Sequence, residues 1–472
     1  MADRLTPLDV SFLYLEEPST VMHVGSVMTF AQPRGGFDYE RLLRHVAARI
    51  AFVPRYRQRV RTVPGRLANP VWVDDERFDL TYHVRRSAVP RPGSDEQLQE
   101  LVARIQPRRL DRTRPLWEVY LVEGLSDGRF ALITKTHQAL VDGVNAVDLA
   151  QVVLDGVAQS ADPPADTWRP SREPTVVELV AGAVVDTWRR PTQVAETVRS
   201  GMTDIGATAG KLAGAVGGLA QVARTAGRPA PDSPLNVPIS AHRRFAMVGT
   251  DLEDYRRVRA RHAGPRSSGV RITVNDVALA TVAGGLREWL LMRGARVSGV
   301  AMKALVPVSV AVEDPVEAGT LGSGVASVIV DLPVGEPNPV LRLQQVAYQM
   351  QAHSESGVAV GAERLANIGG FAPPTLHSLG ARVASGLSRR LFNLVVTNVP
   401  GPQHPLYAAG AKMLASYPVV PLARGQALAI GLTSYHGGVF FGLNADREAM
   451  PDVDELAGCI VEALAALRET AA

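Results

Sequence analysis

The stretch RPLWEVYLVEGLSDGRFALITKTHQALVDGVNAVDLAQVVLDGV, residues 114–157, decides the fold class. Its runs 114–125 and 129–137 are rich in β-branched and aromatic residues, which predicts two strands. Ser126, Asp127 and Gly128 between these runs are typical of a hairpin turn. After Gly143, apolar residues recur at helical spacing. Residues 137–143 therefore connect a strand to a helix, and the pattern predicts a mixed α/β protein.

This connection carries the residues with the most chemical potential. His137 ends the second strand, where a side chain projects into whatever cleft lies there and can act as a base. Asp142 can cap the following helix or pair with an arginine, and Gly143 permits a tight chain reversal. On these residues alone, a structural histidine beside a capping aspartate is a better explanation than catalysis.

The totals bound the class of protein. A chain of 472 residues exceeds one ordinary core, so we expect two domains. A net charge of +3 on that length does not indicate nucleic-acid binding. Cys459 is the single cysteine and falls in an apolar helical pattern, so we expect a buried structural thiol, no disulfide and no cysteine-rich zinc site. The first residues lack a signal-peptide pattern and no apolar run could span a bilayer, which favours a cytoplasmic protein.

Composition divides the chain into three parts. Residues 1–160 alternate predicted helices and strands, with an amphipathic helix over 39–52. Residues 161–238 are Pro-rich and then Gly/Ala-rich, which predicts a crossover linker. For its Gly/Ala part, packed helices, a lipid-contacting element and plain mobility stay open. Residues 239–472 resume mixed α/β character, and residues 272–294 predict a strand end followed by a helix capped by Asn275 or Asp276. A hairpin around His436 and a C-terminal helix capped by Asp452 follow.

Several common catalytic motifs are absent from the sequence. It contains no HExxH, no GxxxxGK[ST], no GxSxG and no convincing GxGxxG. A metalloprotease, a kinase and an α/β-hydrolase are therefore disfavoured, and we expect no metal site.

A set of short motifs follows in order along the chain: LTPLDVSFLYLE (5–16), MHVGSV (22–27), PVWVDDERFDLTYHV (70–84), LDRTRPLWEVYLVEGL (110–125), KTHQALVDG (135–143), ITVNDVALA (272–280), NLVVTNVPGP (393–402) and SYHGGVFFGLNAD (434–446). Together, in this order and at these separations, they resemble the bacterial wax ester synthase/diacylglycerol acyltransferase family of the condensation-domain and CoA-dependent acyltransferase superfamily.

The resemblance implies an α/β (α+β) fold of two chloramphenicol-acetyltransferase-like domains, each a mixed sheet with helices. A helical crossover would join them, with a tunnel between them and an HHxxxDG motif at its middle. It further implies an enzyme that transfers an acyl group from acyl-CoA to diacylglycerol or a long-chain alcohol. The second histidine of the motif would be the general base. Direct transfer needs no metal and no cofactor besides acyl-CoA as substrate.

Mapped onto this sequence, the motif is His137, Gln138, Asp142 and Gly143, so a glutamine stands at the base position. A glutamine amide donates and accepts hydrogen bonds but cannot act as a base near neutral pH. Gln138 is then an engineered change, a natural one in a silent or altered member, or a sign that His137 acts instead. The third account is disfavoured because adjacent residues at a strand end point to opposite sides.

Further residues of the motifs are weaker candidates for substrate binding. Asn275 could shape the pocket or stabilise an oxyanion, but a helix cap is preferred. Trp117 is better explained as a core aromatic, and His23 as a structural histidine. The arginine-rich runs 55–61 and 107–114 could meet CoA phosphates or an anionic membrane, although a solvated face is the favoured interpretation.

Two functions of different kinds follow from the resemblance. The first is an enzyme that makes triacylglycerol or wax ester, in contact with the inner membrane face or with lipid inclusions. The second is a catalytically silent member that binds acyl-CoA or neutral lipid. Peptide-bond condensation is disfavoured because the flanking motifs match the lipid branch and no carrier domain is present.

Overall fold

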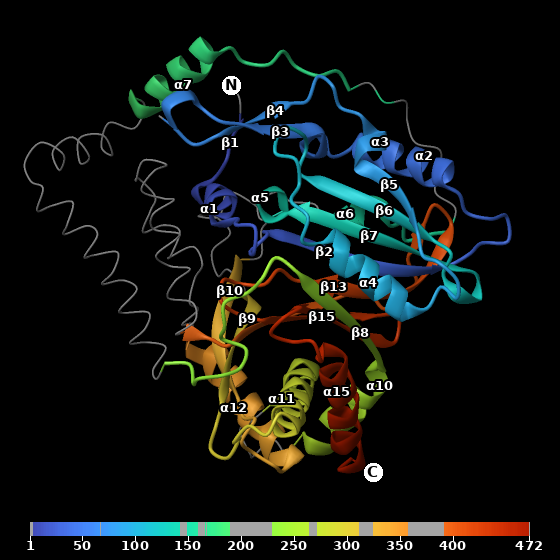
Figure 1. Cartoon of the computed structure of the whole chain (residues 1–472), viewed down its shortest axis with the longest axis vertical. Coiled ribbons are helices and arrows are strands. Elements are labelled where there is room, and N and C mark those ends of the chain that lie inside the picture. The colour runs from blue at the N-terminus through green and yellow to red at the C-terminus, as the bar shows by residue number, and fades with distance from the viewer. Residues whose placement is uncertain are drawn as a thin grey trace, which may run out of the picture.

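Two six-stranded mixed sheets organise the chain, one in each half (Figure 1). The computed structural model describes residues 3–66, 68–141, 149–158, 166, 168–188, 229–263, 271–310, 324–356 and 391–471. The first sheet has the order β12-β13-β2-β7-β6-β5 and the second β10-β9-β11-β14-β15-β8, while β1-β4-β3 form a small third sheet. The predicted class of two mixed α/β units is confirmed.

The strands are β1 (Asp3–Arg4), β2 (His23–Ala31), β3 (Gln58–Arg61), β4 (Val71–Asp74), β5 (Val84–Ala88), β6 (Trp117–Glu123), β7 (Arg129–His137), β8 (Arg243–Asp251), β9 (Met302–Val310), β10 (Gly324–Leu332), β11 (Leu394–Pro400), β12 (Tyr407–Ala408), β13 (Ala411–Val419), β14 (Leu428–Tyr435) and β15 (Gly438–Asp446). The helices are α1 (Pro7–Leu15), α2 (Tyr39–Ile50), α3 (Leu80–His83), α4 (Asp95–Ile105), α5 (Gln138–Val141), α6 (Leu149–Val153), α7 (Val176–Trp188), α10 (Leu252–His262), α11 (Val274–Met292), α12 (Pro339–Ser356) and α15 (Val453–Glu469).

Strand β7 lies in the middle of the first sheet because both of its faces are apolar. Phe130 and Leu132 belong to the core beneath α1, α2 and α6. Ala131 and Ile133 point the other way, into the core shared with α4. This alternation is the two-residue period of a strand. The predicted hairpin from β6 to β7 is confirmed, with Asp127 in the left-handed region at φ 59°.

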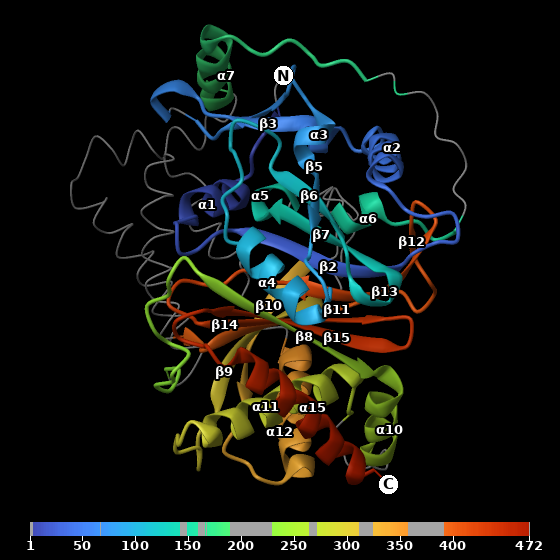
Figure 2. The ribbon, with the colours of Figure 1, turned by 45° about the vertical axis from the view of Figure 1, so that its right-hand side comes forward.

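Helices α10, α11, α12 and α15 cover the outer face of the second sheet (Figure 2). The side-chain cap of α11 is Thr273, which receives a hydrogen bond from the Asp276 N–H while Asp276 accepts from the Thr273 N–H. The prediction of Asn275 or Asp276 as the cap was wrong, because T-x-x-D forms a capping box that starts three residues earlier. Asp452 precedes α15 but makes no side-chain cap, since its carboxylate binds Trp289 and Arg293 instead.

The second half of the chain contributes strands to the first sheet. β13 lies beyond the crossover in sequence, yet it pairs antiparallel with β2 and so extends the first sheet. Residues 239–472, expected as the C-terminal domain, therefore supply β12 and β13 to the N-terminal sheet. The end of β13 then passes over the second sheet, where the Pro418 carbonyl lies against Gly442 of β15.

We expect Gly442→Ala to lower the free energy of unfolding by about 1–3 kcal/mol, the usual cost of overpacking. A Cβ at this position would lie 1.9 Å from the Pro418 backbone oxygen, so the two sheets would have to separate locally. Urea unfolding measures the effect. Gly458→Ala is the control, because a Cβ there meets no atom within 4 Å and alanine inside helix α15 should raise the free energy of unfolding by about 0.5–1 kcal/mol. Equal stability of the two variants would contradict this account of the contact between the halves.

The arginine-rich run 55–61 holds the start of the crossover on the third sheet. Arg57 pairs with Asp166 and stacks over Trp168 at 4.7 Å, and Arg59 binds Glu173 at 2.7 Å. Leu179 of α7 packs on Val71 and Val73 of β4. These arginines thus serve intramolecular pairing rather than a solvated face. The Gly/Ala-rich part of the crossover lies outside the described residues.

Candidate active site

The predicted catalytic connection begins where β7 meets α5. His137 is the last residue of β7 and stands opposite His23, the first residue of β2. Gln138 opens α5 and its backbone N–H donates to the Met22 carbonyl at 2.8 Å. Asp142 and Gly143 lie outside the described residues, so their predicted roles stay predictions.

His137 is buried, with 1% of its surface exposed. Its Nδ1 accepts a hydrogen bond from the Ala139 N–H at 3.1 Å, so the neutral ring carries its proton on Nε2. That Nε2 has no hydrogen-bond partner among the described residues. Burial lowers the pKa of His137 to about 3, which outweighs the opposite effect of Glu16. Because the Nδ1 lone pair is occupied and the Nε2 atom bears the proton, His137 is a poor substitute for the missing base.

The lowered pKa of His137 predicts that the folded protein loses stability in acid. Its pKa of about 3 lies below the ordinary value of 6.5, so the unfolded chain binds more protons between these pH values. This contribution to stability is complete above pH 6.5 and is lost as the pH falls toward 3. We expect His137→Asn to flatten the decline of the free energy of unfolding between pH 7 and 4, since asparagine can still accept from the Ala139 N–H. Urea unfolding at several pH values measures this slope. If the free energy of unfolding of His137→Asn declines with falling pH as steeply as that of His404→Gln, a control at an exposed histidine, the prediction is contradicted.

His23 is buried beside His137, and the two ring centroids are 5.8 Å apart in an edge-to-face arrangement. The His23 Nδ1 lies 3.2 Å from the Gln106 carbonyl, and its Nε2 lies 3.3 Å from Glu16 Oε1. Arg112 binds the other Glu16 oxygen through its Nε at 3.2 Å. Burial acts to raise the pKa of Glu16, but the close His23 ring and the hydrogen bonds from Arg112 outweigh it and lower that pKa to about 2.

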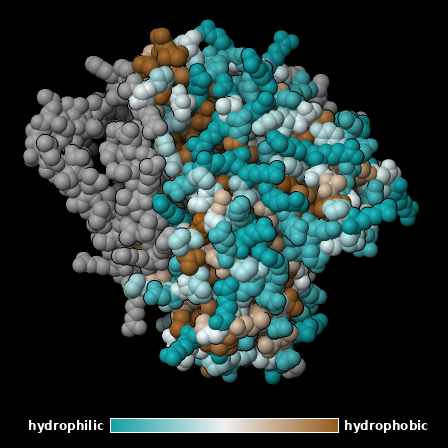
Figure 3. Space-filling model, in the orientation of Figure 1, coloured by the Kyte–Doolittle hydropathy of each residue, from teal (hydrophilic) through white to brown (hydrophobic). Residues whose placement is uncertain are grey.

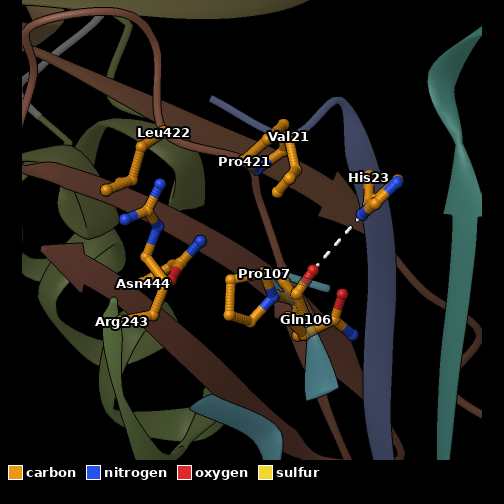
Figure 4. A pocket seen from close by; sticks show the side chains of 9 residues that line it. Val21, His23, Gln106, Pro107, Arg243, Pro421, Leu422 and Asn444 are labelled. Atoms are coloured by element: carbon orange, nitrogen blue, oxygen red, sulfur yellow. Dashed lines mark hydrogen bonds between the residues drawn. The ribbon is translucent and has the colours of Figure 1, made fainter. Parts of the chain in front are cut away.

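A pocket beside His23 lies between the two halves of the chain (Figure 4). Val21, His23, Gln106 and Pro107 line it from the first half, and Arg243, Val419, Pro421, Leu422 and Asn444 from the second. Arg243 is fixed in the wall of this pocket, because its guanidinium donates to the carbonyl of Ser19 in the first half of the chain. His23 therefore faces the junction of the halves as well as the end of β7.

Trp117 lies in the core, where no part of its side chain is exposed. Its indole N–H donates to the Tyr56 carbonyl at 2.7 Å, and its ring stacks on His83 at 4.6 Å. This setting agrees with a core aromatic and leaves no open surface for a substrate.

Asn275 forms a hydrogen bond with a residue of a second sequence motif. Its Oδ1 accepts a hydrogen bond from Nδ2 of Asn398 at 2.8 Å, so the stretches ITVNDVALA and NLVVTNVPGP come together at the start of α11. Because this contact uses the amide oxygen of Asn275, its NH₂ group is the part that can donate to another oxygen.

Glu16 and Arg112 are residues that sequence reasoning did not single out. A glutamate directly after the apolar helix α1 was a usable signal, because a carboxylate on a buried segment requires a partner. Among the described residues, no three His, Cys, Asp or Glu side chains converge as a metal site. Within the same part of the chain, no helix has the length and apolarity that a bilayer crossing requires.

Comparison with known proteins gives matches along the chain. The sequence model of the wax ester synthase/diacylglycerol acyltransferase catalytic domain matches residues 5–278, and that of the C-terminal domain of the same family matches residues 321–468. The probable diacylglycerol O-acyltransferase tgs2 of Mycobacterium tuberculosis is 34% identical over 96% of this chain and 96% of its own length. The related tgs3 is 47% identical over 56% of this chain and 97% of its own length.

Solved structures with the same architecture extend this comparison. The wax ester synthase/diacylglycerol acyltransferase from Marinobacter aquaeolei VT8 is 30% identical, with a TM-score of 0.68 and 99% of each chain covered. The first condensation domain of the CDA synthetase has a TM-score of 0.57 at 16% identity, covering 100% of this chain and 97% of its own, which shows a shared fold.

Proposed function

The chain belongs to the wax ester synthase/diacylglycerol acyltransferase family, and on that premise we propose that it transfers an acyl group from acyl-CoA to diacylglycerol or to a long-chain alcohol. The observation that carries the proposal is the match of the catalytic-domain model across β7 and α5. The products would be triacylglycerol or wax ester.

In the proposed reaction the acceptor hydroxyl oxygen attacks the thioester carbonyl carbon. The new C–O bond forms, the C–S bond breaks, and the hydroxyl proton ends on the CoA sulfur. This balance needs no cofactor besides acyl-CoA. Asn275 supports the chemistry if its NH₂ group donates to the carbonyl oxygen as negative charge develops there.

Gln138 has a limited role in this scheme. Its backbone is fixed by the Met22 carbonyl, and its amide can hold the acceptor hydroxyl by a hydrogen bond. It cannot take the proton, so proximity and polar stabilisation remain as the sources of rate. The reaction of this chain should therefore be slow.

The second candidate is a silent member of the family that binds acyl-CoA or neutral lipid. Gln138 at the base position and the occupied Nδ1 of His137 favour it. Free-thiol release from palmitoyl-CoA, measured with and without diacylglycerol or hexadecanol, tests both candidates. Acceptor-dependent release supports the transferase. Saturable binding of palmitoyl-CoA without release supports the binding protein.

Contact with a lipid surface is part of the proposal, because both acceptors are lipids. Figure 3 shows a hydrophobic patch at the top of the molecule, where α7 lies in Figure 1. Val176 and Val177 at the start of α7 are 52% and 75% exposed. An apolar helix end of this kind suits peripheral contact with a membrane or a lipid inclusion.

A further inference from the structure

Glu16, His23 and His137 form a buried polar cluster behind Gln138 that the proposed reaction does not use. Glu16 follows α1, His23 begins β2 and His137 ends β7. Their exposed fractions are 8%, 2% and 1%. Buried polar groups are normally retained only with partners, so this cluster calls for an explanation.

The contacts of His23 set the number of protons in the cluster. Its Nδ1 faces the Gln106 carbonyl at 3.2 Å, seen as the dashed line in Figure 4, and its Nε2 faces Glu16 Oε1 at 3.3 Å. A carbonyl and a carboxylate are both acceptors, and Arg112 keeps Glu16 ionised. Both nitrogens of His23 must therefore carry a proton for both contacts to be favourable. Without the second proton, a nitrogen lone pair faces either the Glu16 carboxylate or the Gln106 carbonyl, depending on the tautomer.

This pair is connected to the motif by the backbone. Met22, the residue before His23, accepts the hydrogen bond from the Gln138 N–H. His23 itself pairs with His137 across the two strands. The Glu16 carboxylate thus contacts the start of β2 at His23, and the start of β2 binds residues 137 and 138 in turn.

We infer that Glu16 and His23 are positioning residues of the acyl-transfer site, in which the close contact of the Glu16 carboxylate with the His23 imidazole fixes the ends of β2 and β7 beside residue 138. The inference rests on the proposed function. It adds two residues, from elements remote in sequence, to the machinery that aims the motif.

The charges around His23 determine how pH acts on the pair. Glu16 is the anion that favours its second proton, whereas Lys135 of β7 opposes it. Arg112 pairs with Glu16, His137 acts on the charge of Glu16, and Arg243 lines the same pocket as His23 from the second half. Burial lowers the pKa of His23, and the Glu16 carboxylate and the Gln106 carbonyl oppose that shift without cancelling it. His23 therefore loses its second proton below the ordinary histidine pKa of 6.5, and it does so at still lower pH when the carboxylate is removed.

The test compares Glu16→Gln with Glu17→Gln, in the given chain or in the Gln138→His background if turnover of the given chain is too slow. Glutamine keeps the shape of Glu16 but cannot be an anion. We expect kcat to fall about 10- to 100-fold, as for a misplacement of about 1 Å, with the KM for palmitoyl-CoA within about twofold. The alkaline limb of kcat should move to lower pH. Glu17 is the matched control, because its carboxylate is 38% exposed and 3.5 Å from Arg424.

His23→Gln is the second variant, and the double variant Glu16→Gln/His23→Gln should lose no more than either single one, since the two act as a unit. Additive losses, an unmoved pH profile, or a kcat equal to that of Glu17→Gln would overturn the inference. If neither the given chain nor Gln138→His releases thiol, the proposed function itself fails. The pair is then tested by NMR titration of the histidine rings. The inference predicts that Glu16→Gln lowers the titration midpoint of His23 and shifts the His137 signals, and unshifted His137 signals would overturn it.

Discussion

Gln138→His is expected to raise kcat for acyl transfer by about 10²- to 10⁴-fold, the usual worth of general-base assistance. The hydrogen bond that fixes residue 138 comes from its backbone N–H, so a new side chain leaves this anchor in place. A histidine there supplies a lone pair that takes the hydroxyl proton as the oxygen attacks the thioester. Thiol release from palmitoyl-CoA with hexadecanol or diacylglycerol measures the gain. The KM for palmitoyl-CoA should hardly change, because ground-state binding is not altered.

The control for this prediction is Gln138→Asn, which keeps an amide and should bring no gain. The histidine variant should also acquire an ascending limb of kcat near the ordinary histidine pKa of about 6.5. If the unmodified chain is as fast as the Gln138→His variant, another group accepts the proton. If the unmodified chain, Gln138→His and Gln138→Asn all release no thiol but still bind palmitoyl-CoA, the binding-protein candidate is favoured.

Local patterns explain which parts of the fold were predictable. The hairpin from β6 to β7 follows from two runs rich in β-branched and aromatic residues on either side of Asp127 and Gly128, which are both at positive φ. The hairpin around His436 is of the same kind, with β14 and β15 paired on either side. In both cases adjacent residues determine the structure, so the sequence alone was sufficient.

Contacts between distant residues were not predictable in this way. Nothing in residues 411–419 indicates that they pair with β2, since any strand with a suitable apolar face fits the same edge. The Glu16–His23 contact depends on where α1 is placed against the first sheet, which no local pattern specifies. The strand and helix patterns placed residue 138 on the strand-to-helix connection and the resemblance implied its role, but only the geometry shows that the Ala139 N–H occupies Nδ1 of His137.

Trp117 is a motif residue that could act either in the protein core or at the substrate, and two variants distinguish these roles. We expect Trp117→Ala to lower the free energy of unfolding by about 3–5 kcal/mol, the cost of removing a fully buried large aromatic. The change removes the stacking partner of His83 and the N–H that binds the Tyr56 carbonyl. Urea unfolding measures the loss, and Trp168→Ala is the control, because Trp168 is only partly buried and a cation–π contact is worth about 0.5–1 kcal/mol at exposed sites.

Trp117→Phe refines this test, since it keeps most of the ring but removes the indole N–H. A core role predicts an intermediate loss of stability, because the Tyr56 carbonyl is left without its donor inside the core. It also predicts an unchanged KM for palmitoyl-CoA, as the side chain has no exposed surface. A raised KM with stability intact would instead place Trp117 at the substrate. That result would assign the motif containing Trp117 to substrate binding, whereas the contacts of Trp117 assign it to the core, on β6 next to β7.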